Sequence, residues 1–170
     1  MARMIRLAAG CTAGQYNQRK GRRGGFWDGR FRCTAVESGE HLWNCLAYVD
    51  MNMVRAGVVG HPSDWEWCGY REVAGLRERY RILDFERLVE KLEARDIREV
   101  REAYCGLIER RAEAEQFSRE PEWTEPVAVG SEGFVREVAG RLGRRRIEVA
   151  PVEEDEQSTW RAQEVSPRYV

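Results

Sequence analysis

The segment from residue 38 to residue 57 carries the strongest periodic signal in the chain, and the period is that of an α-helix. Its apolar side chains recur three and four residues apart: Leu42, Cys45, Leu46, Val49 and Met53. Such a stripe covers one side of a helix and needs a partner surface to bury it. Ser38 is a suitable N-cap and Gly57 a suitable stop. We therefore expect one helix over 38–57 that packs into a core.

Three further segments show similar apolar spacing with helix caps in front of them. Asp84 is predicted to cap a helix whose apolar face holds Phe85, Leu88, Val89 and Leu92. Asp96, with Glu99 three residues on, forms a capping-box pattern for a helix that runs to about residue 116. Ser131 is predicted to cap a helix that stops at Gly143. The chain should therefore be predominantly helical.

The remaining segments are less regular. Residues 2–16 predict a short amphipathic helix, and residues 17–30 predict a basic, glycine-rich loop. Residues 31–36 alternate between apolar and polar side chains and predict a short strand. Residues 118–130 are expected to form a linker or surface loop. The acidic, polar tail from Val152 is expected to be poorly ordered.

Several classes of protein are excluded by composition. No run of about 18 apolar residues is present, so no transmembrane helix is expected, and the start does not look like a secretory signal. The five cysteines form no CxxC pair, which favours free, mostly buried thiols in a cytoplasmic protein. His41 and His61 lie twenty residues apart and lack the spacing of a metal site.

The net charge of −1 hides a strong asymmetry along the chain. Residues 1–35 carry eight basic side chains and one acidic side chain, for +7, which leaves −8 on the remainder. A basic N-terminal segment, here called the head, followed by an acidic remainder, the body, indicates that the N-terminal segment faces nucleic acid.

Basic and aromatic side chains are interleaved in this head. The basic ones are Arg19, Lys20, Arg22, Arg23, Arg30 and Arg32, and the aromatic ones are Tyr16, Phe26, Trp27 and Phe31. Basic groups engage a phosphate backbone, while aromatic faces stack on unpaired bases. The alternative is a solvated basic loop with no ligand.

A polar stripe runs along the predicted 38–57 helix beside the apolar one: His41, Asn44, Tyr48, Asn52 and Arg55. Residues four apart share a helical face. A tyrosine phenol can attack phosphorus if a nearby cation stabilises it, and an amide oxygen is a suitable ligand for Mg²⁺ or Mn²⁺. The alternative is a half-buried tyrosine with a local hydrogen bond.

Four ordered motifs together resemble the REP-associated tyrosine transposases, which belong to the single-tyrosine HUH insertion-sequence class. They are YNQRKGRRGGFWDGRF at 16–31, YVDMNMVRAGVV at 48–59, HPSDWEWCGY at 61–70 and AVGSEGF at 128–134. The resemblance covers roughly residues 4–145. It implies a DNA transposase that acts on single-stranded DNA with hairpins.

The resemblance also implies roles for individual residues. Tyr48 would attack a DNA phosphodiester and become a 5′-phosphotyrosine, and Asn52 would be the helix-borne ligand of a divalent metal, Mg²⁺ or Mn²⁺. The DNA would be contacted by Arg19, Lys20, Arg22, Arg23, Trp27, Arg30, Arg32 and Arg55.

The sequence departs from the family pattern in several places. The His-hydrophobic-His pair of the family lies on a strand upstream of the first helix, and this chain does not contain it. Met53 replaces a proline, and Cys68-Gly69 replaces a serine pair. We therefore expect a truncated, catalytically impaired transposase that holds metal poorly. Residues 31–36 would then be a strand with an unpaired edge.

The sequence thus predicts an α+β protein, the remnant of a ferredoxin- or RRM-like antiparallel sheet with a helical C-terminal extension. Its predicted parts are a half catalytic domain over 1–70, a helical extension over 71–116, a linker with a short helix over 117–150, and a disordered tail over 151–170. Two alternatives stay open: a non-catalytic module that binds hairpin DNA, and a helical protein-interaction domain built on residues 85–116. No membrane partner is expected, and a homodimer stays open.

Overall fold

The chain is divided into two compact units, and each is described by itself. The computed structural model describes residues 2–27, 33–77, 79–114, 117–143, 146–152 and 159–164. The units are Met1–Arg32, here called the basic unit, and Cys33–Val170, the main unit. The predicted division kept residues 1–70 together, whereas the observed boundary follows Arg32. Residues 33–35 carry no charge, so this boundary also separates the +7 head from the −8 body.

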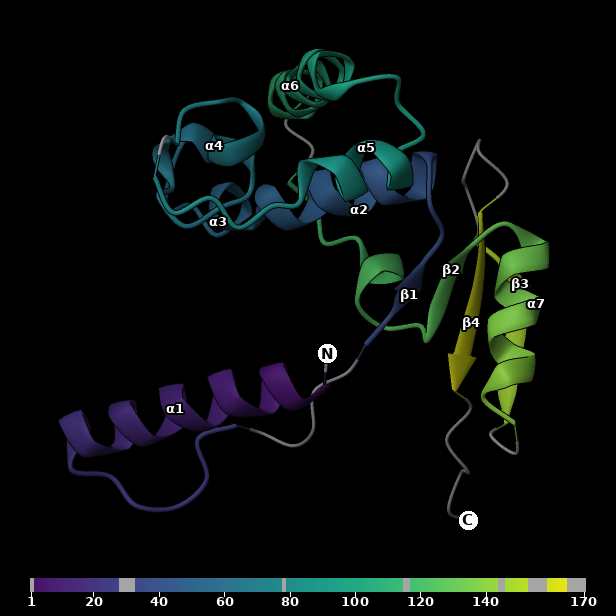
Figure 1. Cartoon of the computed structure of the whole chain (residues 1–170). Coiled ribbons are helices and arrows are strands. Elements are labelled where there is room, and N and C mark those ends of the chain that lie inside the picture. The colour runs from purple at the N-terminus through teal and green to yellow at the C-terminus, as the bar shows by residue number, and fades with distance from the viewer. Residues whose placement is uncertain are drawn as a thin grey trace. The chain divides into compact units, whose positions relative to one another are not determined.

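The basic unit is built on one long helix, α1 (Ala2–Lys20), which is drawn in purple in Figure 1. The helix continues past the predicted end at residue 16, so the predicted loop begins only at Gly21. Arg19 and Lys20 lie in the last turn, where cations interact favourably with the helix dipole. Gly21 then adopts a φ of +60°, the left-handed conformation that commonly ends a helix.

Five short and medium helices and one 3-10 turn form the first part of the main unit. They are α2 (Glu40–Asp50), α3 (Asn52–Arg55), η1 (Pro62–Asp64), α4 (Tyr70–Val73), α5 (Phe85–Lys91) and α6 (Ile97–Glu113). The predicted 38–57 helix is therefore present but interrupted at Met51, where ψ is −3°. Its N-cap is Gly39, not Ser38, because a φ of +73° at the glycine turns the chain just before the helix starts.

The other predicted caps are confirmed. Asp84, Asp96 and Ser131 precede α5, α6 and α7 (Glu132–Arg141), and each is an N-cap. Their side-chain oxygens lie 3.1, 2.9 and 3.3 Å from the backbone nitrogen three residues on. Each cap satisfies a donor that the first helical turn leaves open, which typically stabilises a helix by about 1 kcal/mol.

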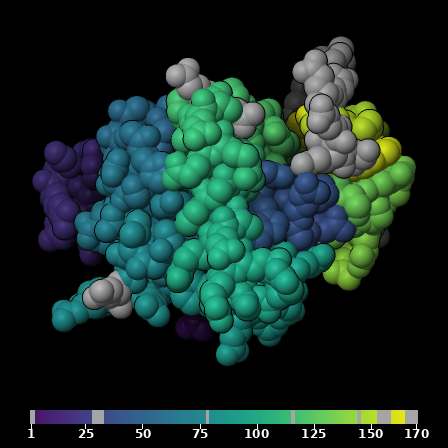
Figure 2. Space-filling view, turned by 90° about the horizontal axis from the view of Figure 1, so that it is seen from above, coloured from purple at the N-terminus to yellow at the C-terminus, as the bar shows by residue number. Residues whose placement is uncertain are grey.

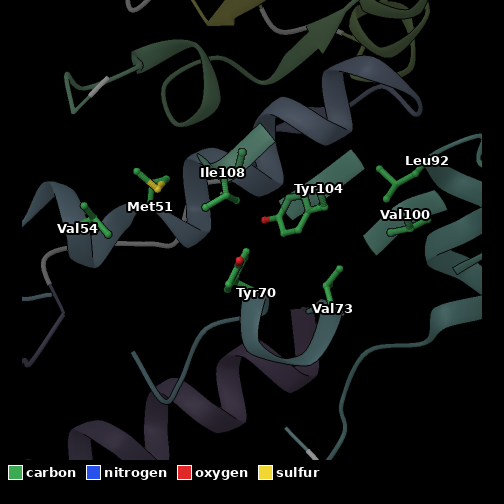
Figure 3. Close-up of a cluster of buried hydrophobic side chains, with 9 residues drawn as sticks. Met51, Val54, Tyr70, Val73, Leu92, Val100, Tyr104 and Ile108 are labelled. Atoms are coloured by element: carbon green, nitrogen blue, oxygen red, sulfur yellow. The ribbon is translucent and has the colours of Figure 1, made fainter. Parts of the chain in front are cut away.

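A helical core fills the space between α2, α4 and α6 (Figure 3). Its buried side chains are Ala47, Met51, Val54, Tyr70, Val73, Leu92, Val100, Tyr104 and Ile108. The apolar stripe of the predicted helix supplies part of the surrounding shell through Leu42 and Leu46. Full burial of a large apolar side chain contributes about 1.5–3 kcal/mol relative to exposure, so this cluster is the main source of stability.

A four-stranded mixed sheet forms the second part of the main unit. Its strands are β1 (Ala35–Val36), β2 (Ala128–Gly130), β3 (Ile147–Pro151) and β4 (Trp160–Glu164), in the order β1-β2-β4-β3. The β1–β2 pair is parallel, with Ala35 opposite Ala128, and the other pairs are antiparallel. The α+β class is confirmed.

Three predictions about this region are wrong. The predicted linker or surface loop over 118–130 ends in a buried strand, because residues 128–130 form β2 inside the sheet. β1 is not an orphan strand, because it pairs with β2 of the same chain and forms an edge of the sheet. The segment predicted to be a disordered tail contains β4, which lies between β2 and β3 in the sheet. The apolar side of β4 explains its order, since Ala162 is fully buried against Ala128 and Val135. Helix α7 supplies Val135 and lies along the sheet in Figure 1.

The outer surface of α5 and α6 carries exposed charged side chains. These helices, coloured teal to green, lie on the face seen in Figure 2. Arg95, Arg98 and Glu102 are exposed there. None of the helices in the described part of the chain is long and apolar enough to cross a membrane. All five cysteines are free, and Cys11 and Cys33 are exposed, contrary to the expectation of mostly buried thiols.

Candidate functional site

Tyr48, Asn52 and Arg55 lie together at the junction of α2 and α3. The Tyr48 side chain is buried, with 6% of its surface exposed. The guanidinium carbon of Arg55 lies 3.8 Å from the centre of the Tyr48 ring, which is a cation–π contact. Arg55 also donates a hydrogen bond from Nη2 to Asn52 Oδ1. The structure therefore brings together the three residues that the polar stripe predicted to share a face.

The arrangement does not suit Asn52 as a metal ligand. Its amide oxygen already accepts from Arg55, and a cation held there repels a second cation. Within the described ranges, no group of three or more His, Cys, Asp or Glu side chains is placed to hold a metal ion. In the described part of the chain, Asn52 is therefore engaged by Arg55 and is not placed as a ligand for Mg²⁺ or Mn²⁺.

The two histidines have structural partners. His61 accepts a hydrogen bond at Nδ1 from the backbone N–H of Ser63, at 3.2 Å, and so caps η1. Its Nε2 lies 3.3 Å from Glu109 Oε1. His41 Nε2 lies 3.3 Å from Thr159 Oγ1.

The predicted DNA-binding side chains of the basic unit fall near the end of α1 and in the segment after it. Arg19, Lys20, Arg22, Arg23 and Trp27 are all exposed. Arg30 and Arg32 lie outside the described residues. Arg55, the eighth predicted contact, belongs to the main unit, where its guanidinium is engaged by Tyr48 and Asn52.

The segment after α1 folds back along the helix and is held there by hydrogen bonds. The Arg22 N–H donates to Asn17 O at 2.9 Å, and Asn17 Nδ2 donates to Gly24 O at 3.1 Å. Trp27 Nε1 donates to Ala9 O at 3.0 Å, two turns further back along α1. Within residues 2–27, the predicted loop is therefore a non-regular segment that runs back along α1.

A row of aromatic rings and one cation follows this return segment. The Tyr16 and Phe26 rings lie 4.8 Å apart, and the Phe26 and Trp27 rings meet edge-on at 4.7 Å. The guanidinium carbon of Arg22 lies 5.7 Å from the centre of the Tyr16 ring. The row therefore combines positive charge with exposed π surface, because Tyr16 and Trp27 remain 39% and 55% exposed.

Sequence reasoning missed a buried polar pair in the main unit. Tyr104 donates a hydrogen bond to Asp50 Oδ2 at 2.6 Å, and the Gly69 N–H donates to Asp50 Oδ1 at 2.9 Å. Burial raises the pKa of Asp50, and burial together with the Asp50 charge raises the pKa of Tyr104. A signal was present, since Asp50 stands four residues after Leu46, within the apolar stripe.

The Asp50–Tyr104 pair borders an apolar cavity of about 220 Å³ in the helical core. The other lining side chains are aliphatic: Leu46, Val49, Val73, Leu83, Leu88, Leu92 and Val100. Each oxygen of Asp50 accepts a hydrogen bond from within the protein, one from Tyr104 and one from Gly69. We assign the pair a structural role that joins α2 to α6.

Comparisons of this chain with protein-family models, with curated proteins and with solved structures found no match.

Proposed function

We propose that this protein binds single-stranded or hairpin DNA through the exposed face of its basic unit, as a transposase-like protein that does not cut the strand. The observation that carries the proposal is the row formed by Tyr16 of α1 with Arg22, Phe26 and Trp27 of the segment that follows the helix. Together with Arg19, Lys20 and Arg23, it sets cations beside aromatic faces. That combination binds unpaired strands through phosphates and bases at once.

Charge distribution supports the same surface. The basic unit carries +7 and the main unit −8, so the polyanion is attracted to one and repelled by the other. The basic side chains are predominantly arginines, whose planar fork of donors matches a phosphate group. The resemblance to the transposases also places this segment in the half of the domain that contacts DNA. With the function, we propose that the chain is the remnant of a ferredoxin- or RRM-like transposase domain and that it acts in the cytoplasm.

Strand cleavage by Tyr48 is the second candidate. The Arg55 guanidinium over the Tyr48 ring favours it, because a cation stabilises negative charge on a phenol. Two observations weigh against it: Asn52 is engaged by Arg55, and the Tyr48 side chain is 94% covered. We therefore propose binding without cleavage.

Salt-dependent binding tests the proposal. The full chain should bind a hairpin oligonucleotide with a single-stranded arm, and the affinity should fall steeply as salt rises. Replacing Arg22 and Arg23 by glutamine should reduce the slope of log K against log salt by about 1.4, since each phosphate contact on a single strand contributes about 0.7. The matched control replaces Arg79 and Arg98, two exposed arginines of the main unit, and should change neither affinity nor slope.

A covalent assay separates binding from cleavage. The full chain is incubated with the same labelled hairpin and Mn²⁺, and denaturing gels are inspected for a protein–DNA adduct. We expect none. An adduct that disappears in Tyr48→Phe would establish the second candidate instead, whereas absence of binding by the unaltered chain would overturn both.

A further inference from the structure

Among the described aromatic residues of the basic unit, Trp27 is the most exposed, yet its ring is held in place. Its indole is 55% exposed, while Nε1 donates to Ala9 O at 3.0 Å and the Phe26 ring meets it edge-on at 4.7 Å. A tryptophan that served only as packing would be expected to bury its faces. Here the polar edge of the ring is anchored to α1, and part of the ring surface remains open to solvent.

The anchoring decides what the indole can recognise. Its single N–H is used by Ala9, so it has no hydrogen-bond donor left to read the edge of a base. What it offers is π surface, and every base has a π face, so recognition by stacking is tolerant of sequence. In a duplex the base faces are covered by neighbouring pairs, so only an unpaired base can lie on the ring.

The neighbouring charges point the same way. Arg22 lies over Tyr16, and Tyr16 contacts Phe26, which contacts Trp27. A cation at one end of this row and an open indole at the other provide a place for a phosphate and a place for a base. Fixing the ring in advance also reduces the side-chain entropy that binding would otherwise remove.

We propose that Trp27 is the base-stacking residue of the basic unit and that it selects unpaired nucleotides over duplex with little preference among bases. This inference rests on the proposed DNA-binding function and names the substrate class of the same surface. Arginines supply the salt-dependent part of the affinity, and Trp27 supplies a part that salt does not change.

Two matched variants test the role of the aromatic face. Trp27→Phe and Trp27→Leu both lose the N–H that bonds Ala9, but only the phenylalanine keeps a π surface. With a single-stranded arm of thymidines, Trp27→Leu should bind about tenfold more weakly than the unaltered chain, and Trp27→Phe within about threefold of it. The slope of log K against log salt should stay the same in both. Trp67→Leu, at an indole 73% exposed on the main unit, is the control and should bind normally.

An oligonucleotide with abasic sites in the arm provides the second readout. It keeps the phosphates and removes the bases, so the unaltered chain should bind it about as weakly as Trp27→Leu binds the intact arm, and Trp27→Leu should lose less than twofold further. Equal losses for the leucine and phenylalanine variants, or equal losses on intact and abasic arms, would show that Trp27 acts only through folding. If the unaltered chain binds and Trp27→Leu binds equally well, this inference fails alone; if the unaltered chain does not bind, the proposed function fails with it.

Discussion

Asp50 is an acid in an apolar environment, and its ionisation should change the free energy of unfolding. Burial disfavours its charged form and raises its pKa above the ordinary value of 3.8, although hydrogen bonds from Tyr104, Gly69 and the Tyr70 backbone oppose the shift. Below pH 3.8 the carboxyl is protonated in both folded and unfolded chains. Between 3.8 and the raised pKa, only the folded chain holds the proton, so stability decreases as pH rises through that window.

Comparison with Asp50→Asn isolates this effect. Asparagine keeps one oxygen that can accept from the Gly69 N–H, and its amide N–H can donate to the Tyr104 hydroxyl, but it does not ionise in this pH range. The free energy of unfolding of the unaltered chain, relative to that of the variant, should be highest at acid pH. It should fall by up to about 1.4 kcal/mol per pH unit within the window, measured by urea unfolding from pH 3 to pH 7.

Asp96 provides a control, because its contribution to stability should change with pH in the opposite direction. The backbone N–H of Glu99 is the main cause that lowers its pKa, because it stabilises the charged N-cap. Its contribution is present above the ordinary pKa and is lost as pH falls through the lowered one. The difference between the unaltered chain and Asp96→Asn should therefore shrink on acidification. If the difference in unfolding free energy between the unaltered chain and the variant changed with pH in the same direction for both aspartates, the environments assigned to them would be contradicted.

At the residue scale, the sequence correctly predicted which side chains share a face of a helix, because the helical period alone determines this. A spacing of four places Tyr48 beside Asn52, and the structure confirms that they share a face with Arg55. The sequence could not predict that Arg55 occupies the Asn52 oxygen, because the orientation of a long side chain depends on its three-dimensional surroundings. It likewise could not predict that Tyr104 reaches Asp50, since 54 residues separate them.

At the scale of elements, the contact between β1 and the start of α7 depends on a glycine. Glu37, just after β1, accepts hydrogen bonds from the Ser131 backbone N–H and hydroxyl. Gly130 packs closely against this contact. A Cβ there would lie 2.7 Å from Glu37 Cβ and 2.8 Å from Phe134 Cδ1, closer than carbon atoms approach without displacement.

We therefore expect Gly130→Ala to destabilise the main unit by about 1–3 kcal/mol, the usual cost of overpacking a close contact. Gly140→Ala in α7 is the matched control, because its Cβ would meet nothing within 4 Å. That substitution should stabilise the helix by up to about 1 kcal/mol. Thermal unfolding followed by circular dichroism measures both, and an unchanged midpoint in Gly130→Ala would show that Glu37 can move aside at no cost.

The elements differ in how well the sequence predicts them, for a physical reason. Helices and their caps depend on residues within one or two turns, and α5, α6 and α7 begin where Asp84, Asp96 and Ser131 indicate. Strands depend on distant partners. Ala35 pairs with Ala128, and β4 is ordered by neighbours on both sides, so neither the partner of β1 nor the order of the 160–164 segment follows from local pattern.

For the whole molecule, the division into two units coincides with the division of charge. Of the 28 basic and 29 acidic side chains, eight and one lie in Met1–Arg32. Every buried apolar side chain among the described residues belongs to the main unit. Stability and the proposed binding surface therefore reside in different parts of the chain.

Removal of residues 1–32 should separate the two properties. The remaining fragment, Cys33–Val170, keeps both cores and should unfold within about 0.5 kcal/mol of the full chain, because surface away from a core contributes little to stability. Its net charge of −8 should abolish binding to the hairpin oligonucleotide, since the fragment lacks the cations and repels the phosphates. Urea unfolding and a titration at low salt measure the two outcomes. A fragment that still binds the hairpin would place the binding surface in the main unit, and one that fails to fold would show that the basic unit takes part in its core.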